Sequence, residues 1–222
     1  MNRRDFLTLP PLAAPLLLRT PLLAAPPALP MPAQPIACFG RRWLVQQAAD
    51  WEVEQTPEGE VLNLNVPRPQ EANPRAPIQY ALLEQEPAGC FTLNVEVRGF
   101  AASTSLIVVY AWRDPLHFDY VHLSTDAARK QPVHNGVFHV YGGDRVRISR
   151  DDGPASLSDA LHWTRVRIVY DASKGLVETW IDGRKHPSLR GADLSLGAGR
   201  VGLGSFFNTG SFRKFELQPG AC

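Results

Sequence analysis

Residues 118–123 read Phe-Asp-Tyr-Val-His-Leu, and this stretch decides the fold because aromatic rings and histidine occupy alternate positions, opposite an apolar set. Successive side chains of a β-strand point to opposite faces of its sheet. The alternation therefore predicts a strand with Tyr120 and His122 on one face and Val121 and Leu123 on the other. Such a strand gives one apolar face to a core and leaves a polar and aromatic face for a ligand.

The chain that follows the first 35 residues repeats this pattern of short alternating runs between turn signals, and it contains no convincing amphipathic helix. Asp182-Gly183 is a strong type I′ hairpin signal. The principal strands are predicted over residues 51–54, 61–64, 78–83, 91–97, 106–112, 118–123, 137–141, 145–149, 163–170, 176–181, 200–206 and 212–217. This number of strands predicts an all-β protein, a two-sheet antiparallel β-sandwich of the jelly-roll type.

The N-terminal stretch is predicted to lie outside this fold. Residues 2–7, Asn-Arg-Arg-Asp-Phe-Leu, resemble a twin-arginine export signal and precede a leucine-rich run. Thr8 stands where the usual basic residue would be, and prolines are frequent, so a Pro-rich disordered tail is the alternative. We therefore expect a signal segment and Pro/Ala linker over residues 1–35, a single sandwich domain over residues 36–222, and a periplasmic or secreted protein.

Charge and composition exclude several classes of partner. The chain has 23 basic and 22 acidic residues, and without residues 1–25 these become 20 and 21, so the formal charge changes from +1 to −1. This balance gives no indication of nucleic-acid binding. The N-terminal apolar run is too short for a membrane span and is interrupted by prolines and Arg19.

The chain has three cysteines, Cys38, Cys90 and Cys222. None belongs to a CxxC motif, so a zinc site or a thioredoxin-type redox site is not expected. An exported protein meets an oxidising compartment, where one bridge between two of them can form. The alternative, three cysteines that form no disulfide bridge, is expected about as strongly as one bridge.

Histidines gather around the deciding strand. His117, His122, His134 and His139 lie in one hairpin region, and imidazole is both the usual acid–base group near neutral pH and a common metal ligand. Their spacings match no standard metal motif, so no metal is predicted and a metal site is the minority alternative. His117 and His139 are interpreted as surface residues. The predicted catalytic residues are His122, His134, Asn135 and Tyr120.

Aromatic and planar polar side chains indicate a sugar ligand. Alternation along the strands allows one sheet face to carry Trp112, Tyr120, His122, Arg145, Arg147, Arg165, Arg167, Glu178 and Trp180. A sugar site needs rings that stack on C–H faces and planar groups that bridge hydroxyls. The alternative is a solvated face on which arginine and glutamate pair across strands. The predicted substrate-binding residues are Arg145, Trp112, Trp180, Glu178 and Arg167.

The usual two-carboxylate glycosidase arrangement is missing. Retaining glucanases that have a jelly-roll sandwich fold carry a Glu-x-Asp-x-x-Glu strand, whereas Glu178 is followed by Thr-Trp-Ile-Asp. The chain also lacks a Gly-x-Ser-x-Gly elbow and a phosphate-binding loop. Asp151-Asp152-Gly153 is interpreted as a loop turn, with half of a calcium loop as the alternative.

The closing strands carry a family resemblance. The runs at residues 163–170, 177–183, 199–205 and 212–215 resemble those of concanavalin A-like lectin/glucanase domains. Within that superfamily they are similar to the laminin-G-like jelly rolls known as 3-keto-disaccharide hydrolase domains, and the similarity covers roughly residues 50–218. The resemblance implies sugar or glycan processing outside the cytoplasm, and it supplies no agreed catalytic set.

Together these features predict an exported protein that acts on a carbohydrate or sugar derivative, as a hydrolase or lyase. His122 or His134 would transfer the proton, assisted by Tyr120 and Asn135, and Arg145 would bind an acidic or carbonyl oxygen. The alternatives are a non-catalytic, lectin-like carbohydrate-binding module and an interaction domain of the cell envelope.

Overall fold

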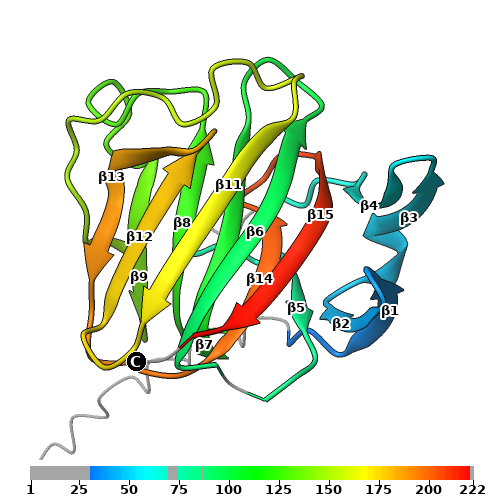
Figure 1. The fold of residues 1–222 in the computed structure, drawn as a ribbon, viewed down its shortest axis with the longest axis horizontal. Coiled ribbons are helices and arrows are strands. Elements are labelled where there is room, and N and C mark those ends of the chain that lie inside the picture. Colours follow the sequence, from blue (N-terminus) through cyan, green and yellow to red (C-terminus); the bar gives the residue numbers. More distant parts are fainter. Residues whose placement is uncertain (1–30, 70–74, 87, 221–222) are drawn as a thin grey trace, which may run out of the picture.

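A computed structural model describes residues 31–69, 75–86 and 88–220. Within these ranges the chain forms two antiparallel sheets packed as a sandwich, so the predicted fold is confirmed (Figure 1). The predicted export signal falls on residues 1–30 and lies outside the described residues. The first strand begins at Gln34, inside the segment that was predicted to be a linker.

The eight-stranded sheet holds the deciding strand near one edge. The part of the sheet at this edge is a meander of consecutive neighbours, which places β8 between β7 and β9. The strands, in spatial order, are β1 (Gln34–Cys38), β2 (Arg41–Val45), β5 (Gln79–Leu83), β14 (Arg200–Ser205), β7 (Ser105–Asp114), β8 (His117–Ser124), β9 (Gly136–Tyr141) and β10 (Val146–Arg147).

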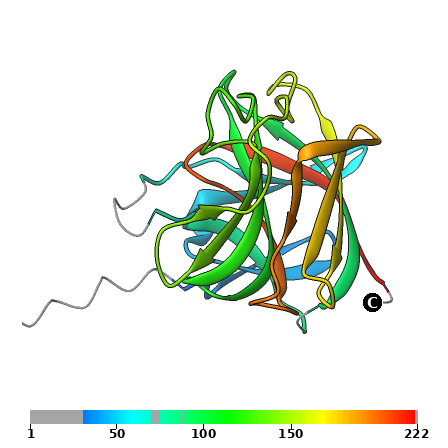
Figure 2. The same cartoon turned by 90° about the vertical axis from the view of Figure 1, so that its left-hand side faces the viewer.

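The seven-stranded sheet forms the second layer, seen from the side in Figure 2. The predicted type I′ turn joins two of its strands, and both Asp182 and Gly183 have the positive φ that this turn requires. In spatial order the strands are β13 (Arg184–Ala192), β12 (Leu176–Ile181), β11 (Thr164–Asp171), β6 (Cys90–Gly99), β15 (Gly210–Pro219), β4 (Gly59–Leu64) and β3 (Trp51–Thr56). One short 3-10 turn, η1 (Ala48–Asp50), precedes β3.

The main core lies between the sheets and follows the predicted alternation. Val121 and Leu123 of β8 are fully buried there, together with Val108 of β7 and Val137 of β9. Each fully buried side chain of this size contributes about 1.5–3 kcal/mol through the hydrophobic effect. This inter-sheet core fixes the register of β8 and therefore the side to which Tyr120 and His122 point.

A second apolar cluster covers the opposite face of the eight-stranded sheet. We call it the outer cluster; its members are Ala76, Tyr80, Leu82, Ile107, Val109, Trp112, Phe118, Tyr120, Phe138 and Val140. Residues 75–77 run across this face and are tied to the turn between β9 and β10, because Arg145 N donates to the Arg75 carbonyl and Arg75 N donates to Asp144. The face that the sequence predicted to be open is therefore covered by chain and by aromatic rings.

Three strands were not predicted from the sequence, namely β1, β2 and β13. β13 is an edge strand with exposed polar residues and a proline, so its sequence lacks the alternation that marks a buried strand. Cys90 is disulfide-bonded, whereas Cys38 is a free, buried thiol. Among the described residues, no helix has the length and apolar character needed to cross a membrane.

Candidate functional site

The structure brings four predicted site residues together on the outer face of the eight-stranded sheet. We call Tyr120, His122, His134 and Arg145 the site cluster. Arg145 Nη1 lies 3.0 Å from the Tyr120 hydroxyl and 3.2 Å from His122 Nδ1. The rings of His122 and His134 are in contact, with their centroids 5.3 Å apart. Alternation along β8 places Tyr120 beside His122, and β9 and β10 return the chain so that His134 and Arg145 approach them.

The inner part of this cluster is sealed from solvent. Tyr120 and His122 are each 0% exposed, which corrects the expectation that their face would be open. The His122 ring stacks on Phe206, with centroids 5.7 Å apart, and it also contacts Phe138. The physical reason is that the outer cluster packs aromatic rings around β8, so the second face of this strand is also a packed face.

Burial and a cation keep His122 neutral. Burial lowers the pKa of His122 well below its ordinary value of 6.5, and the nearby Arg145 guanidinium lowers it further. Arginine can only donate, so His122 Nδ1 accepts the bond from Arg145 and the ring proton is assigned to Nε2. Burial also raises the pKa of the Tyr120 hydroxyl above its ordinary range.

Two buried donors of the site cluster have no acceptor. His122 Nε2 and Arg145 Nη2 are both buried and make no hydrogen bond within the described part of the chain. The Arg145 guanidinium lies against the rings of Phe206 and Phe138, at 4.1 and 4.7 Å. Buried polar atoms in proteins normally have a partner, and each exception needs an explanation, such as a catalytic role or a bound water or ion. These two donors are suited to an oxygen atom, such as that of a carbonyl or carboxylate.

His134 is the imidazole of the cluster that solvent reaches. Its side chain is 17% exposed, and its Nδ1 lies 3.1 Å from Asp126 Oδ2. Its Nε2 has no hydrogen-bond partner among the described residues. A carboxylate that holds one ring nitrogen orients the imidazole and leaves the other nitrogen available for proton transfer. The sequence indicated His122 at least as strongly as His134 for proton transfer. The structure distinguishes them because His122 is fully buried and His134 is partly exposed.

Asn135 has a structural place in the loop rather than a place in the site cluster. Its φ is 48° and its side chain is fully buried. Its amide nitrogen donates to Ser188 Oγ at 3.1 Å and to the Pro154 carbonyl, while its oxygen accepts from Ser156 N at 2.8 Å. These bonds join the loop before β9 to the segment at residues 154–156 and to β13, and they occupy both the nitrogen and the oxygen of the amide. The expected assistance of Asn135 in proton transfer therefore lacks the required geometry.

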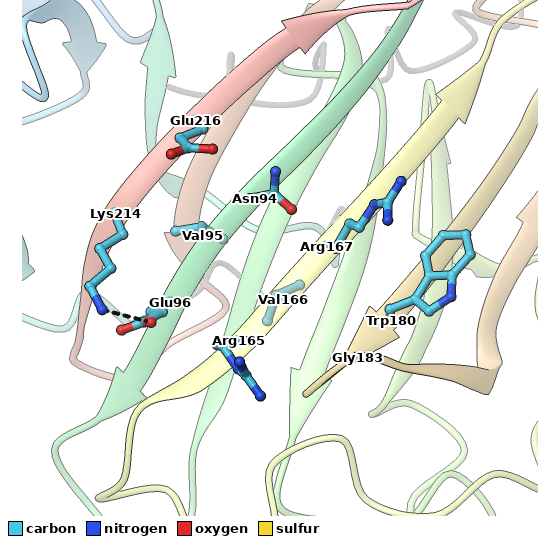
Figure 3. Close-up of a pocket in the computed structure, with 10 residues that line it drawn as sticks. All are labelled: Asn94, Val95, Glu96, Arg165, Val166, Arg167, Trp180, Gly183, Lys214 and Glu216. Atoms are coloured by element: carbon cyan, nitrogen blue, oxygen red, sulfur yellow. Dashed lines mark hydrogen bonds and ion pairs between the residues drawn. The ribbon is translucent and has the colours of Figure 1, made fainter.

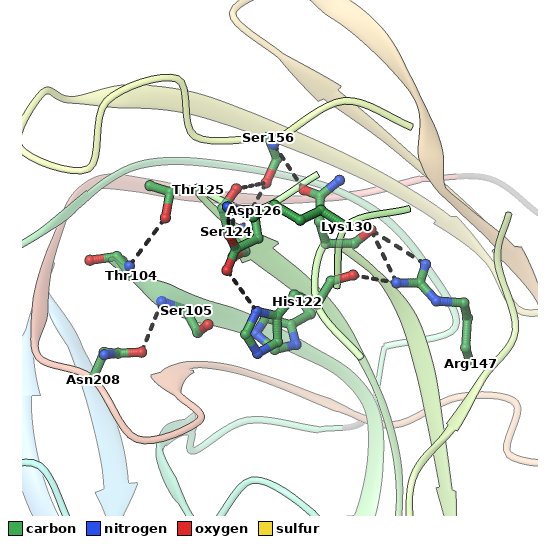
Figure 4. A network of polar contacts seen from close by, with 12 residues as sticks. Thr104, Ser105, His122, Ser124, Thr125, Asp126, Lys130, Arg147, Ser156 and Asn208 are labelled. Atoms are coloured by element: carbon green, nitrogen blue, oxygen red, sulfur yellow. Dashed lines mark hydrogen bonds and ion pairs between the residues drawn. The ribbon is translucent and has the colours of Figure 1, made fainter. Parts of the chain in front are cut away.

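Arg147 holds the same loop from the other side. Its guanidinium donates to the carbonyls of Pro132, His134 and Arg150, which orders the segment that presents His134. Figure 4 shows the Arg147 side chain in the polar network that also contains Asp126 and Lys130. Gly136 leaves room for this guanidinium, because a Cβ atom at that position would lie 2.0 Å from Arg147 Nη1 and would displace it. Arg147 was predicted to share the ligand face, and the structure places it as a clamp on the loop.

Trp112 lies on the same face as the site cluster but far along the strand. It is 5% exposed, and its indole donates to the Tyr80 hydroxyl at 3.0 Å. His122 pairs with Ile107, and Trp112 is five residues further along β7, a separation of about 17 Å in an extended strand. Trp112 therefore packs within the outer cluster and forms no wall beside His122.

Trp180, Arg167 and Glu178 belong to the other sheet, which corrects the expectation of a single face. Glu178 is held in an exposed ion pair with Arg190 at 2.9 Å and a second with Lys185. Arg167 lies over the Trp180 ring at 5.3 Å. Alternation gives the side of each strand, whereas the sheet to which a strand belongs depends on pairing far along the chain.

The outer face of the seven-stranded sheet has an open groove of about 340 Å³ (Figure 3). Trp180 pairs with Arg167, Arg167 with Asn94, and Asn94 with Glu216, so these residues form one row across β12, β11, β6 and β15. The side chains of Arg167, Asn94 and Glu216 make no hydrogen bond or ion pair among the described residues. The row thus combines one ring, over which Arg167 and Lys185 lie at 5.3 and 5.5 Å, with the two uncommitted polar side chains of Asn94 and Glu216.

The sequence did not predict several residues of the site cluster and of the groove on the seven-stranded sheet. Phe138 and Phe206 were interpreted only as strand residues, and their contact with Arg145 depends on the pairing of distant strands. Asn94 and Glu216 were not singled out, although their positions alternate with buried neighbours. Asp126 was noted only as an acid near the histidines, and the loop between β8 and β9 brings it to His134.

Comparison with known proteins shows the fold. No protein-family model matches the chain, and no curated protein matches it. The carbohydrate-binding module CBM66 from Bacillus subtilis is similar, with a TM-score of 0.56 and 11% identity over 79% of this chain and 94% of that chain. A protein of unknown function with a galectin-like fold, also from Bacillus subtilis, has a TM-score of 0.50 and 15% identity over 79% and 88% of the two chains.

The GH43 protein BlXynB from Bacillus licheniformis is also similar, with a TM-score of 0.52 and 11% identity, over 79% of this chain and 35% of that chain. At these identities the likeness establishes the architecture alone. It agrees with the concanavalin A-like sandwich expected from the closing strands.

Proposed function

We propose that this protein acts on a carbohydrate, with an oxygen of the sugar bound by Arg145 and His122 and a proton transferred by His134. One observation carries the proposal: His122 Nε2 and Arg145 Nη2 are buried donors without an acceptor in the described part of the chain. One of the two belongs to a cation, so the pair favours a carboxylate or a polarised carbonyl over a simple hydroxyl. His134 and Arg145 are the partly exposed members of the cluster, so a sugar would approach from their side. To reach His122 Nε2 and Arg145 Nη2, the sugar oxygen would have to displace the side chains that seal these two atoms from solvent.

The chemistry that suits these groups is elimination from an oxidised sugar. A carbonyl or carboxylate oxygen held by Arg145 and His122 acidifies the neighbouring C–H bond, and His134 removes that proton while Asp126 steadies the imidazole. The electron pair of the C–H bond then forms the enolate and a C=C bond, and the glycosidic C–O bond breaks. The departing oxygen takes the proton back from His134.

This chemistry agrees with the two activities predicted from the sequence. A lyase ends with the elimination, whereas a hydrolase of the 3-keto-disaccharide type adds water to the unsaturated product. The resemblance of the closing strands and the names of the structural neighbours support a carbohydrate as the ligand class. The twin-arginine-like start supports a periplasmic or secreted location, where such sugars are met.

The test is a turnover screen with 3-keto-disaccharides and uronic-acid oligosaccharides. We expect His134→Gln to abolish turnover while sugar binding is retained, and Arg145→Lys to weaken binding by at least tenfold because a bidentate donor is lost. His162→Gln is the matched control, since His162 also lies beside an aspartate, Asp159, but on the exposed surface. Full turnover by the His134 variant would overturn the proposed role of this imidazole.

A second candidate function is non-catalytic carbohydrate binding on the seven-stranded sheet. The observation that favours it is the open row of Trp180, Arg167, Asn94 and Glu216. A ring with adjacent planar polar groups is suited to the apolar face and the hydroxyls of a sugar. Trp180→Ala should then weaken glycan binding, measured on a glycan array, by at least tenfold. Binding that depends on Arg145 and is unaffected by the Trp180 variant would exclude this surface.

A further inference from the structure

A row of polar side chains lies between the two sheets, at one end of the sandwich. β7, β8 and β9 are neighbours, and their register sets Tyr110 beside Asp119 and Asp119 beside His139. Alternation directs Asp119 to the inner side of β8, opposite to Tyr120. Asp119 is a buried carboxylate, 1% exposed, and His139 Nδ1 lies 2.7 Å from its Oδ1. The row is distinct from the site cluster, which occupies the other face of the same strands.

Asp193 closes this row from the loop that follows β13. Its Oδ2 lies 3.7 Å from His139 Nδ1. The Asp193 carboxylate is itself fixed, because Ser195 donates to it from both its backbone nitrogen and its hydroxyl, at 3.1 and 2.7 Å. One ligand atom from each of Asp119, His139 and Asp193 can be chosen so that all three lie within 4.8 Å of one another.

A buried hydroxyl without a partner also faces these residues. Tyr110 is 1% exposed, and its hydroxyl makes no hydrogen bond within the described part of the chain. Both Asp119 and Asp193 contribute to raising the pKa of Tyr110, after the larger effect of burial, so both carboxylates lie near this hydroxyl. The neighbouring Tyr170 is already committed, since its hydroxyl donates to the Gly197 carbonyl at 2.7 Å. Tyr110 is thus an orphan polar group beside an aspartate–histidine–aspartate set.

We propose that Asp119, His139 and Asp193 bind a divalent transition-metal ion, with Zn²⁺ as the best match. Zinc takes imidazole nitrogen at about 2.0–2.1 Å and carboxylate oxygen at about 2.0–2.2 Å, so ligand atoms around it are separated by about 3–3.5 Å. The distances from His139 Nδ1 to the two carboxylates, 2.7 and 3.7 Å, bracket that range. Three protein ligands leave a fourth position for water, to which the Tyr110 hydroxyl can hydrogen-bond. Two carboxylates and one neutral imidazole together balance a divalent charge.

The ion would tie the two layers together at this end of the sandwich. Asp119 and His139 belong to the eight-stranded sheet, whereas Asp193 follows an edge strand of the seven-stranded sheet. The competing explanation is an ion pair between His139 and the two aspartates without any metal. Only the metal explanation predicts a stoichiometric ligand that all three side chains are needed to hold.

The test is titration of the chelator-treated protein with ZnCl₂ by calorimetry, with metal content measured by mass spectrometry after dialysis. We expect one equivalent of zinc and a higher melting temperature in its presence. His139→Gln and Asp193→Asn should each weaken zinc binding by at least tenfold. His162→Gln should bind zinc as the wild type does, because the exposed pair of His162 and Asp159 lacks a third ligand.

Folding of each variant is checked by its melting temperature without metal, and Asp193→Asn is the milder change because Asp193 lies in a loop. Three outcomes would overturn the proposal: no zinc retained by the wild-type protein, binding at more than one equivalent that His139→Gln leaves unchanged, or loss of binding in His162→Gln. None of these results depends on sugar turnover, so this proposal and the proposed function can fail separately.

Discussion

Replacing His122 by phenylalanine should remove a large part of the acid sensitivity of this protein. His122 is fully buried, its ring stacks on Phe206, and burial and Arg145 lower its pKa well below 6.5. The folded protein therefore resists protonation of this ring, whereas the unfolded chain accepts the proton readily. Stability is lost as the pH falls below 6.5 toward the folded-state pKa, because the unfolded state then binds more protons.

The size of the effect follows from linkage. The His122 imidazole has an ordinary pKa of 6.5 in the unfolded chain and stays neutral in the folded protein. Between pH 7.5 and pH 5.0 this difference lowers the unfolding free energy of the protein by about 2 kcal/mol. Phenylalanine keeps a flat ring between Phe206 and Phe138 and cannot titrate. It forfeits the bond from Arg145, which costs about 1.5–3 kcal/mol at both pH values. His186, whose pKa burial also lowers, titrates in both proteins and cancels in the comparison.

Urea unfolding followed by tryptophan fluorescence at pH 7.5 and pH 5.0 measures this difference. The unfolding free energy of the wild type should fall by about 2 kcal/mol more than that of His122→Phe over this interval. Tyr120→Phe is the matched control, because it also loses a bond from Arg145 but keeps the imidazole, so it should follow the wild type. Equal losses in the wild type and His122→Phe would refute the argument that His122 is buried and neutral.

Three further predictions concern the loop, the core and the N-terminus. Asn135→Ala should lower the unfolding free energy, measured in urea, by about 2–4 kcal/mol, because it removes buried hydrogen bonds and leaves alanine at a positive φ. Asn135→Gly should lower the unfolding free energy by less, because glycine adopts a positive φ without strain. Equal losses in the two variants would contradict the role of φ. Gly204→Ala should lower the unfolding free energy by at least about 3 kcal/mol, because its Cβ atom would lie 2.2 Å from the Gln79 carbonyl oxygen. Gly143→Ala is the control, because a Cβ atom there meets no atom within 4 Å, and its melting temperature should stay within a few degrees of the wild-type value. A reporter fused to residues 1–35, the predicted signal segment and linker, should be exported in folded form, and replacing Arg3 and Arg4 together by lysine should block that export; unchanged export in this double variant would contradict the prediction.

Much of the local structure could be predicted because it depends on neighbours in the sequence. Alternation in residues 118–123 determined that Tyr120 and His122 share a face, and the buried Val121 and Leu123 confirm it. The Asp182-Gly183 pair determined a type I′ turn through the backbone freedom of these two residues. The proximity of His122, His134 and Arg145 also followed from the sequence, because consecutive strands β8, β9 and β10 form a simple meander.

Only the tertiary structure decided which faces are open and which strands share a sheet. Alternation assigns a side chain to one side of its own strand, but Trp180 and Trp112 proved to lie on different sheets because those strands pair with segments far away in the chain. The burial of His122 depends on its ring contacts with Phe206 and Phe138, neither of which is adjacent to it in the sequence. The pairing of strands and the covering of a sheet face both depend on contacts between residues that are far apart in the sequence. A local sequence pattern therefore cannot predict them.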